Sequence, residues 1–194
     1  MDGDALEQAK ERLSRARDAL AILKGKGLRG PRESAWLDVI SALGTVNSKL
    51  EQGAKANSKS AAWFTNRKRE CKNDPLLQYV HQSRNAAEHG ITRGSHYAKQ
   101  AVSFTGMKPG TTAGLQMTAQ GLKPFSTDPD MQLNFVEDDI VLMAVRNRGV
   151  VYPPPTRHLD SELEQTSASH VADLAVTYFE EMIIDAQNLV TGAV

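Results

Sequence analysis

The chain has 194 residues, of which 40% are hydrophobic and 24% are charged, the size and composition of one soluble globular domain. Its acidic N-terminus has no apolar core, which argues against a secretory signal, and its longest aliphatic run, residues 140–145, is far too short to span a membrane. A single cysteine excludes an internal disulfide, so we expect a cytoplasmic protein.

The net charge of zero conceals an uneven distribution. Residues 55–99 hold nine Lys/Arg and three Asp/Glu, a net charge of +6, whereas residues 126–194 hold three and twelve, a net charge of −9. A basic segment favours an anionic ligand such as RNA. The alternative is that the two segments attract each other, within one fold or between subunits.

The first third of the chain has the apolar spacing of helices. Leucine and alanine recur every three or four residues from Leu6 to Leu23, which is typical of a bundle helix. A second apolar stripe runs from Trp36 to Leu50. Residues 59–72 predict a third, shorter helix.

A fourth helix is predicted to begin at Asp74 and to end at Gly90. Aspartate is a favoured N-cap and proline is favoured at the first helical position, which Pro75 would occupy. Glycine readily takes the left-handed conformation that ends a helix.

Between residues 95 and 155 the pattern changes to that of short strands. Residues 140–145 predict a buried strand, and Asn147-Arg148-Gly149 predicts a turn before another strand. Ser161 and Glu164 form a capping-box pattern, which predicts that a last helix begins there.

The expected fold is therefore mainly α, a helical bundle with a small antiparallel β insertion before its last helix. We expect one domain over residues 1–194, with residues 95–155 as the insertion.

Residues 84–89, Arg-Asn-Ala-Ala-Glu-His, carry the clearest chemistry of the chain. The arginine fork can hold a phosphate, and histidine can transfer a proton near neutral pH. Five residues correspond to a rotation of about 140° on a helix, so Arg84 and His89 converge only if the helix ends near His89. The alternative is an ordinary histidine beside an ion pair of Arg84 with Glu88, one turn later.

The Arg-polar-x3-His pattern of Arg84, Asn85 and His89 resembles the signature of HEPN domains (higher eukaryotes and prokaryotes nucleotide-binding). The wider stretch from Trp63 to Ile91 is similar to HEPN-like bacterial proteins. The family fold is an α-helical bundle, which agrees with the predicted helices. Residues 95–155 have no counterpart in the minimal family fold.

In catalytic members this signature implies a metal-independent endoribonuclease of toxin or phage-defence type. Arg84 would hold the scissile phosphate, His89 would act as general acid or base, and Asn85 would position the pair or hold phosphate. The products would be 2′,3′-cyclic phosphate and 5′-hydroxyl ends. Family protomers usually share one cleft, which implies a homodimer, and a toxin would have an antitoxin or other protein partner. Other members are non-catalytic, so a scaffold that binds a protein or nucleotide is the alternative.

Five cations near the motif are candidate contacts to RNA phosphates: Arg67, Lys68, Arg69, Lys72 and Arg93. For the run in the third helix, the alternative is a solvated helix face. His81 and His96 lie near the motif, but no carboxylate or thiolate accompanies them at a metal-binding spacing. We therefore expect no metal site and no cofactor.

Overall fold

The computed structural model describes residues 1–25, 29–89, 95–97, 101–105, 108, 110–118, 121–128, 132–136, 140–163 and 166–192. Within this part of the chain the protein is mainly helical, with small antiparallel strand pairs. The chain divides into two compact units, residues 1–97 with 140–194 and residues 98–139. Each unit is described by itself.

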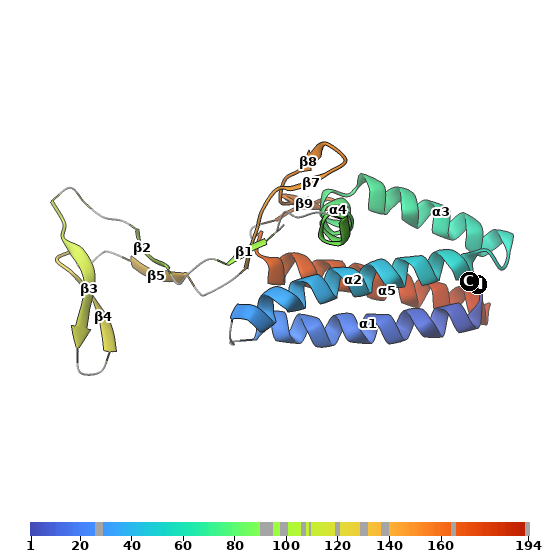
Figure 1. Cartoon of the computed structure of the whole chain (residues 1–194), viewed down its shortest axis with the longest axis horizontal. Coiled ribbons are helices and arrows are strands. Elements are labelled where there is room, and N and C mark those ends of the chain that lie inside the picture. Colours follow the sequence, from blue (N-terminus) through green and yellow to red (C-terminus); the bar gives the residue numbers. More distant parts are fainter. Residues whose placement is uncertain are drawn as a thin grey trace. The chain divides into compact units, whose positions relative to one another are not determined.

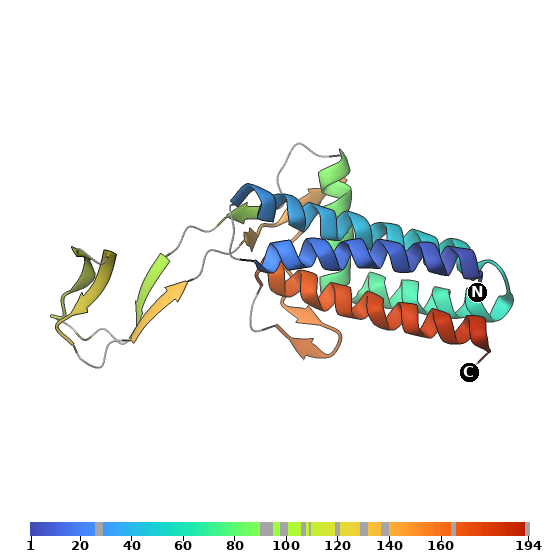
Figure 2. The same cartoon turned by 90° about the horizontal axis from the view of Figure 1, so that it is seen from below.

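Helices make up most of the larger unit: α1 (Gly3–Lys24), α2 (Arg29–Ala54), α3 (Ser58–Asn73), α4 (Pro75–His89) and α5 (Ala168–Thr191). Helices α1, α2 and α5 lie side by side, and α4 crosses them (Figures 1 and 2). All five contribute to one buried apolar core, for example through Leu23, Trp36, Phe64, Tyr79 and Met182. Burying such a side chain stabilises the fold by about 1.5–3 kcal/mol. Within the described ranges, none of the helices has the length and apolar character needed to cross a bilayer.

The helix starts are set by local hydrogen bonds. The Asp2 side chain caps α1 by accepting the Ala5 N–H at 2.8 Å, as an N-cap aspartate should. At the other end of α1, the buried Arg32 side chain donates to the Leu23 carbonyl at 3.1 Å, which satisfies one of the carbonyls that a helix end leaves unpaired. The predicted first, second and third helices are confirmed.

The described strands form two-stranded antiparallel sheets. In the larger unit, β1 (Ser95–Tyr97) pairs with β6 (Ile140–Leu142), β7 (Val145–Asn147) with β8 (Val150–Tyr152), and β9 (Arg157–His158) with β10 (Ser161–Glu162). In the smaller unit, β2 (Ala101–Thr105) pairs with β5 (Gln132–Val136), and β3 (Ala113–Thr118) with β4 (Gly121–Ser126). The predicted turn before β8 is confirmed: Arg148 and Gly149 have φ of 48° and 82°, the positive values that a tight hairpin turn requires.

Two predicted boundaries are wrong. The single strand expected at 140–145 is divided into β6 and β7, because the first half pairs with β1 and the second with β8. Between them the Met143 carbonyl accepts a hydrogen bond from the Tyr79 hydroxyl at 2.7 Å. The last helix begins at Ala168, where Ser167 caps it, and Ser161 belongs to β10 instead. Glu164 and the predicted helix end at Gly90 lie outside the described residues.

Asp74 joins α3, α4 and the turn between β9 and β10. One carboxylate oxygen accepts the Leu77 N–H at 2.7 Å, which caps α4 as predicted, and also accepts from His158 Nδ1 at 3.1 Å. The other accepts the Leu159 N–H at 2.6 Å. Burial alone would raise the pKa of Asp74, but the hydrogen bonds from His158, Leu77 and Leu159 outweigh it and lower the pKa. The buried carboxylate therefore fixes the first turn of α4 to the C-terminal part of the unit.

We expect the Asp74→Ala substitution to destabilise the protein by about 3 kcal/mol, because it removes a cap, breaks a buried pair and leaves the Leu159 N–H unsatisfied. The matched control is Asp2→Ala, which removes an exposed cap and should cost about 1 kcal/mol. Urea unfolding followed by circular dichroism measures both. Equal losses in the two variants would show that the contacts to His158 and Leu159 contribute nothing.

The lowered pKa of Asp74 determines the direction in which the unfolding free energy changes with pH. The Asp74 contribution is present above the ordinary carboxyl range and is lost as the pH falls through the folded-state pKa, which lies below that range. The unfolding free energy of the wild type should therefore fall more steeply below that range than that of Asp74→Ala.

Candidate functional site

Helix α4, which carries the motif, is held along its middle turns by the β6–β7 segment. The Tyr79 hydroxyl is bonded to Met143 as described above, and burial raises the pKa of Tyr79 to about 12, so it stays a donor. Three residues later, the Gln82 side chain accepts from the Asn147 amide at 2.7 Å. These contacts with the β6–β7 segment fix the rotation of α4 about its axis. They therefore also fix the side of the helix on which each residue of 84–89 lies.

Arg84 lies against α2 at a position where α2 has no side chain. A Cβ placed on Gly44 would lie 2.5 Å from Arg84 Cδ and 2.7 Å from Arg84 Nε, well inside contact distance. The Arg84 side chain is 28% exposed. Its Nε is fully buried and has no hydrogen-bond partner within the part of the chain that the structure describes. The guanidinium is therefore half-buried against α2, and its Nε–H is a donor without an acceptor among the described residues.

Arg84 also forms an ion pair with Glu88, one turn along α4. The distance between Arg84 Nη2 and Glu88 Oε1 is 2.8 Å, and the Glu88 side chain is 40% exposed. This is the ion pair that the alternative interpretation of the motif expected. Arg84 differs from a solvated surface residue, however, because of its contact with Gly44 and its buried Nε. A carboxylate is itself an oxyanion, so this arrangement holds an oxyanion on the outer edge of the guanidinium.

The other motif residues are placed only in part. His89 is the last residue of α4, and its side chain lies outside the described residues. The Asn85 amide nitrogen is 3.1 Å from His81 Nε2. Although His81 is exposed, partial desolvation of its ring and the charge of Arg84 lower its pKa. His81 had no role in the predicted site, yet helical spacing alone places it one turn before Arg84 and Asn85.

The cations predicted to contact RNA have protein partners in most cases. Arg67 bridges Glu70 at 2.6 Å and Asp185 at 2.5 Å, and Lys68 pairs with Glu51 at 2.8 Å. Arg69 donates to the side-chain oxygen Oδ1 of Asn66 at 3.1 Å, Lys72 is exposed, and Arg93 lies outside the described residues. RNA contact by these five residues stays a prediction.

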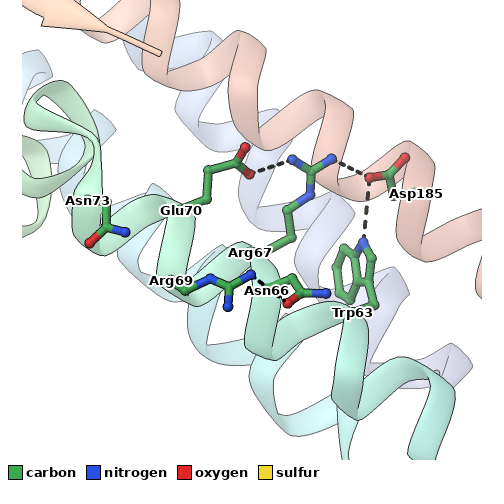
Figure 3. Close-up of a pocket in the computed structure, with 7 residues that line it drawn as sticks. All are labelled: Trp63, Asn66, Arg67, Arg69, Glu70, Asn73 and Asp185. Atoms are coloured by element: carbon green, nitrogen blue, oxygen red, sulfur yellow. Dashed lines mark hydrogen bonds and ion pairs between the residues drawn. The ribbon is translucent and has the colours of Figure 1, made fainter. Parts of the chain in front are cut away.

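A pocket of about 410 Å³ opens beside Arg67, between α3 and α5 (Figure 3). Its lining residues are Trp63, Asn66, Arg67, Arg69, Glu70, Asn73 and Asp185. Burial would lower the pKa of Arg67, but the hydrogen bonds to Asp185 and Glu70 outweigh it and raise the pKa. Arg67 belongs to the basic segment and Asp185 to the acidic one, so part of the charge asymmetry is satisfied within the fold. The pocket has two cations and two carboxylates, which gives no preference for an anion.

A network of polar groups lies next to this pocket. The Tyr178 hydroxyl donates to Glu70 at 2.7 Å, and the Cys71 thiol is 3.7 Å from the same hydroxyl. Burial raises the pKa of Cys71, so the thiol is a poor nucleophile at neutral pH. Among the described residues, no three His, Cys, Asp or Glu side chains form a cluster that could hold a metal ion.

We expect Gly44→Ala to displace the Arg84 side chain while the protein stays folded. The added methyl group must push aside a flexible side chain, and alanine favours a helix interior by about 0.5–1 kcal/mol. The measurement is the Nε–Hε NMR signal of Arg84, together with urea unfolding. The control is Gly30→Ala in the same helix, where a Cβ would meet no atom within 4 Å. An unchanged Arg84 signal in Gly44→Ala would refute the close contact.

No family model, curated protein or solved structure matches this chain. The resemblance to HEPN domains thus depends on the residues of the motif and its surrounding stretch.

Proposed function

We propose that the protein is a metal-independent endoribonuclease in which Arg84 binds the scissile phosphate. The observation that supports this most is the state of the Arg84 guanidinium: it lies against Gly44, its buried Nε has no hydrogen-bond partner among the described residues, and it already holds a carboxylate. A phosphate can replace that carboxylate at the half-exposed guanidinium. Two parallel N–H bonds to one oxyanion are the arrangement for which arginine is suited.

In this proposal the RNA 2′-hydroxyl attacks the phosphorus held by Arg84. His89, at the end of α4, transfers a proton during the reaction, and the chain is cut into a 2′,3′-cyclic phosphate and a 5′-hydroxyl end. No cofactor is needed. Because Arg84 and His89 are about 140° apart on the helix, we propose that two copies of the chain form a homodimer whose motifs complete one shared cleft. The HEPN resemblance suggests a cytoplasmic toxin or phage-defence role with an antitoxin partner.

The proposal predicts cleavage of RNA by the purified protein in the presence of EDTA. His89→Ala should lower the rate by about 10²–10⁴-fold, the usual effect of losing a general acid or base. Arg84→Ala should lower it by about 10²–10³-fold through lost charge stabilisation. The control is His170→Ala on α5, away from α4 in the chain. Intact RNA after incubation with wild type, or equal cleavage by all four proteins, would end this proposal.

A second candidate function is a non-catalytic module that binds a protein or nucleotide partner. The observation that favours it is the separate unit of residues 98–139. In the β1–β6 pair, Tyr97 and Ile140 lie directly opposite each other, so a two-residue turn could close that hairpin. The larger unit therefore does not need 98–139 to complete its own strands, which suggests a separate role such as binding.

The two candidates differ in what happens when residues 98–139 are replaced by Asn-Gly, the favoured two-residue hairpin turn. We expect the larger unit to keep its unfolding free energy within about 1 kcal/mol, since its core lies outside this segment. If α4 carries an enzyme site, RNA cleavage persists in the shortened protein. If the insertion is a binding module and the protein is not an enzyme, partner capture is lost and neither protein cleaves RNA.

A further inference from the structure

We infer that the pocket between α3 and α5 is a binding site for one nucleobase of a single-stranded RNA. The choice of RNA as the source of the base rests on the ribonuclease proposed above, but binding of a base is measured without any cleavage. The pocket surrounds Arg67, and its seven lining residues are those drawn in Figure 3.

The centre of the pocket is a fixed cation that is already neutralised. Arg67 Nη1 bonds to Glu70 at 2.6 Å, and Arg67 Nη2 bonds to Asp185 at 2.5 Å. The Arg67 guanidinium carbon lies 5.7 Å from the centre of the Tyr178 ring, and the side chain is 25% exposed. Because both terminal nitrogens are bonded to carboxylates, Arg67 does not make the pocket an anion site.

An aromatic ring forms one end of the pocket. Trp63 is half-buried, and its indole N–H points to Asp185 Oδ2 at 3.5 Å, which orients the ring. Figure 3 shows the Trp63 indole at one end of the row of lining residues and Asn73 at the other. Ten residues of helix, about 15 Å, separate the two, so the pocket is elongated. Its volume of about 410 Å³ is in the range of sites for small ligands.

The polar groups around the ring include both donors and acceptors. Asn66 and Arg69 are exposed and supply N–H donors, and the bond of 3.1 Å from Arg69 to Asn66 Oδ1 orients both side chains. Asp185 Oδ1 takes no part in the bonds to Arg67 and Trp63, so it is an acceptor. A nucleobase has donors and acceptors on one planar edge, and its face stacks on aromatic or guanidinium planes. A phosphate has acceptors only, which would leave the Asp185 carboxylate unpaired.

The pocket is separate from the proposed cleavage site. Asn73 directly precedes Asp74, the N-cap of α4, and Arg84 lies ten residues further on, about 15 Å along the helix. The bound base therefore belongs to a nucleotide beyond the scissile bond. The sequence predicts phosphate contacts for Arg67 and Arg69, and the pocket gives them a base contact instead. Recognition of that base would give cleavage a sequence preference.

The chain has its own probe for this site. It contains two tryptophans, and Trp36 is 1% exposed in the core, so the two indole N–H signals in a proton–nitrogen NMR spectrum distinguish the pocket from the interior. Adenosine monophosphate and guanosine monophosphate should shift the Trp63 signal in a saturable way and leave the Trp36 signal in place. Ribose phosphate, which has no base, is the control ligand and should shift neither. An equal response to ribose phosphate, or no saturable response to either nucleotide, would overturn the inference.

Substitutions test the site in the full-length protein by isothermal titration calorimetry. Trp63→Leu should raise the Kd for adenosine monophosphate by about 5–150-fold, the loss of one base–aromatic stack. Asn66→Ala should raise it by about 2–10-fold, the loss of one hydrogen bond. Asn66 is exposed, so this variant tests the site even if Trp63→Leu unfolds. Gln8→Ala on α1, which also removes an exposed amide, is the matched control and should keep the wild-type Kd. An unchanged Kd in the folded pocket variants would show that the base binds elsewhere.

Experiments with RNA separate this inference from the proposed function. A single-stranded oligoribonucleotide should bind wild type more tightly than Trp63→Leu, whereas the same RNA in a duplex should bind both alike, because paired bases cannot enter the pocket. If the protein binds the nucleotides but cleaves no RNA, the base site stands and the ribonuclease proposal fails. If it cleaves RNA and the Trp63 signal does not respond to nucleotides, the ribonuclease proposal stands and this inference is wrong.

Discussion

The position of Arg84 depends on the absence of a side chain at residue 44. Without a Cβ there, the Arg84 side chain can lie on the backbone of α2, and its Nε becomes buried. A glycine inside a helix costs about 0.5–1 kcal/mol relative to alanine, and a buried donor without a partner costs about 1–3 kcal/mol. The Arg84–Glu88 pair is half-exposed and returns at most about 1 kcal/mol. The Arg84–Glu88 pair therefore does not offset the costs of Gly44 and of the buried Nε.

Asp74 has the corresponding role at the other end of α4. Its carboxylate starts the helix and ties it to His158 and Leu159, while Tyr79 and Gln82 hold the next turns. A helix that is anchored at its start and along its middle presents its remaining stripe in a defined direction. Rigid placement of this kind is what a site needs if it is to hold a phosphate at one spot.

Local signals in the sequence were sufficient wherever one segment decides its own structure. The apolar stripes of the long helices and the aspartate-proline start of α4 are of this kind, and these predictions are confirmed. The capping-box pattern at Ser161 failed because those residues pair with β9 instead, and the Leu163 N–H bonds to the Thr156 carbonyl at 2.9 Å. Strand pairing here outcompetes a local helix signal.

The same distinction explains which parts of the candidate site could be found from the sequence. Spacing along one helix identifies the stripe of His81, Arg84, Asn85 and Glu88, since all four belong to α4. It cannot show that Gly44, forty residues earlier in the chain, makes room for Arg84. Nor can a tally of charges show that Arg67 is bound by Asp185, because that partner comes from the last helix. Contacts between elements distant in the sequence are therefore the features of the candidate site that could not be predicted from the sequence.

Charge pairing within the fold also decides where a phosphate can bind. Arg67 already has two carboxylate partners and Lys68 has one, so a phosphate at Arg67 must compete with two carboxylates. At Arg84 it must displace a single half-exposed carboxylate, a loss of at most about 1 kcal/mol. The phosphate would take over the charged hydrogen bond that Glu88 now makes with Arg84 Nη2. Lys68 also has a single carboxylate partner, but it is more exposed than Arg84, so the half-buried guanidinium of Arg84 is the cation on which the proposed function relies.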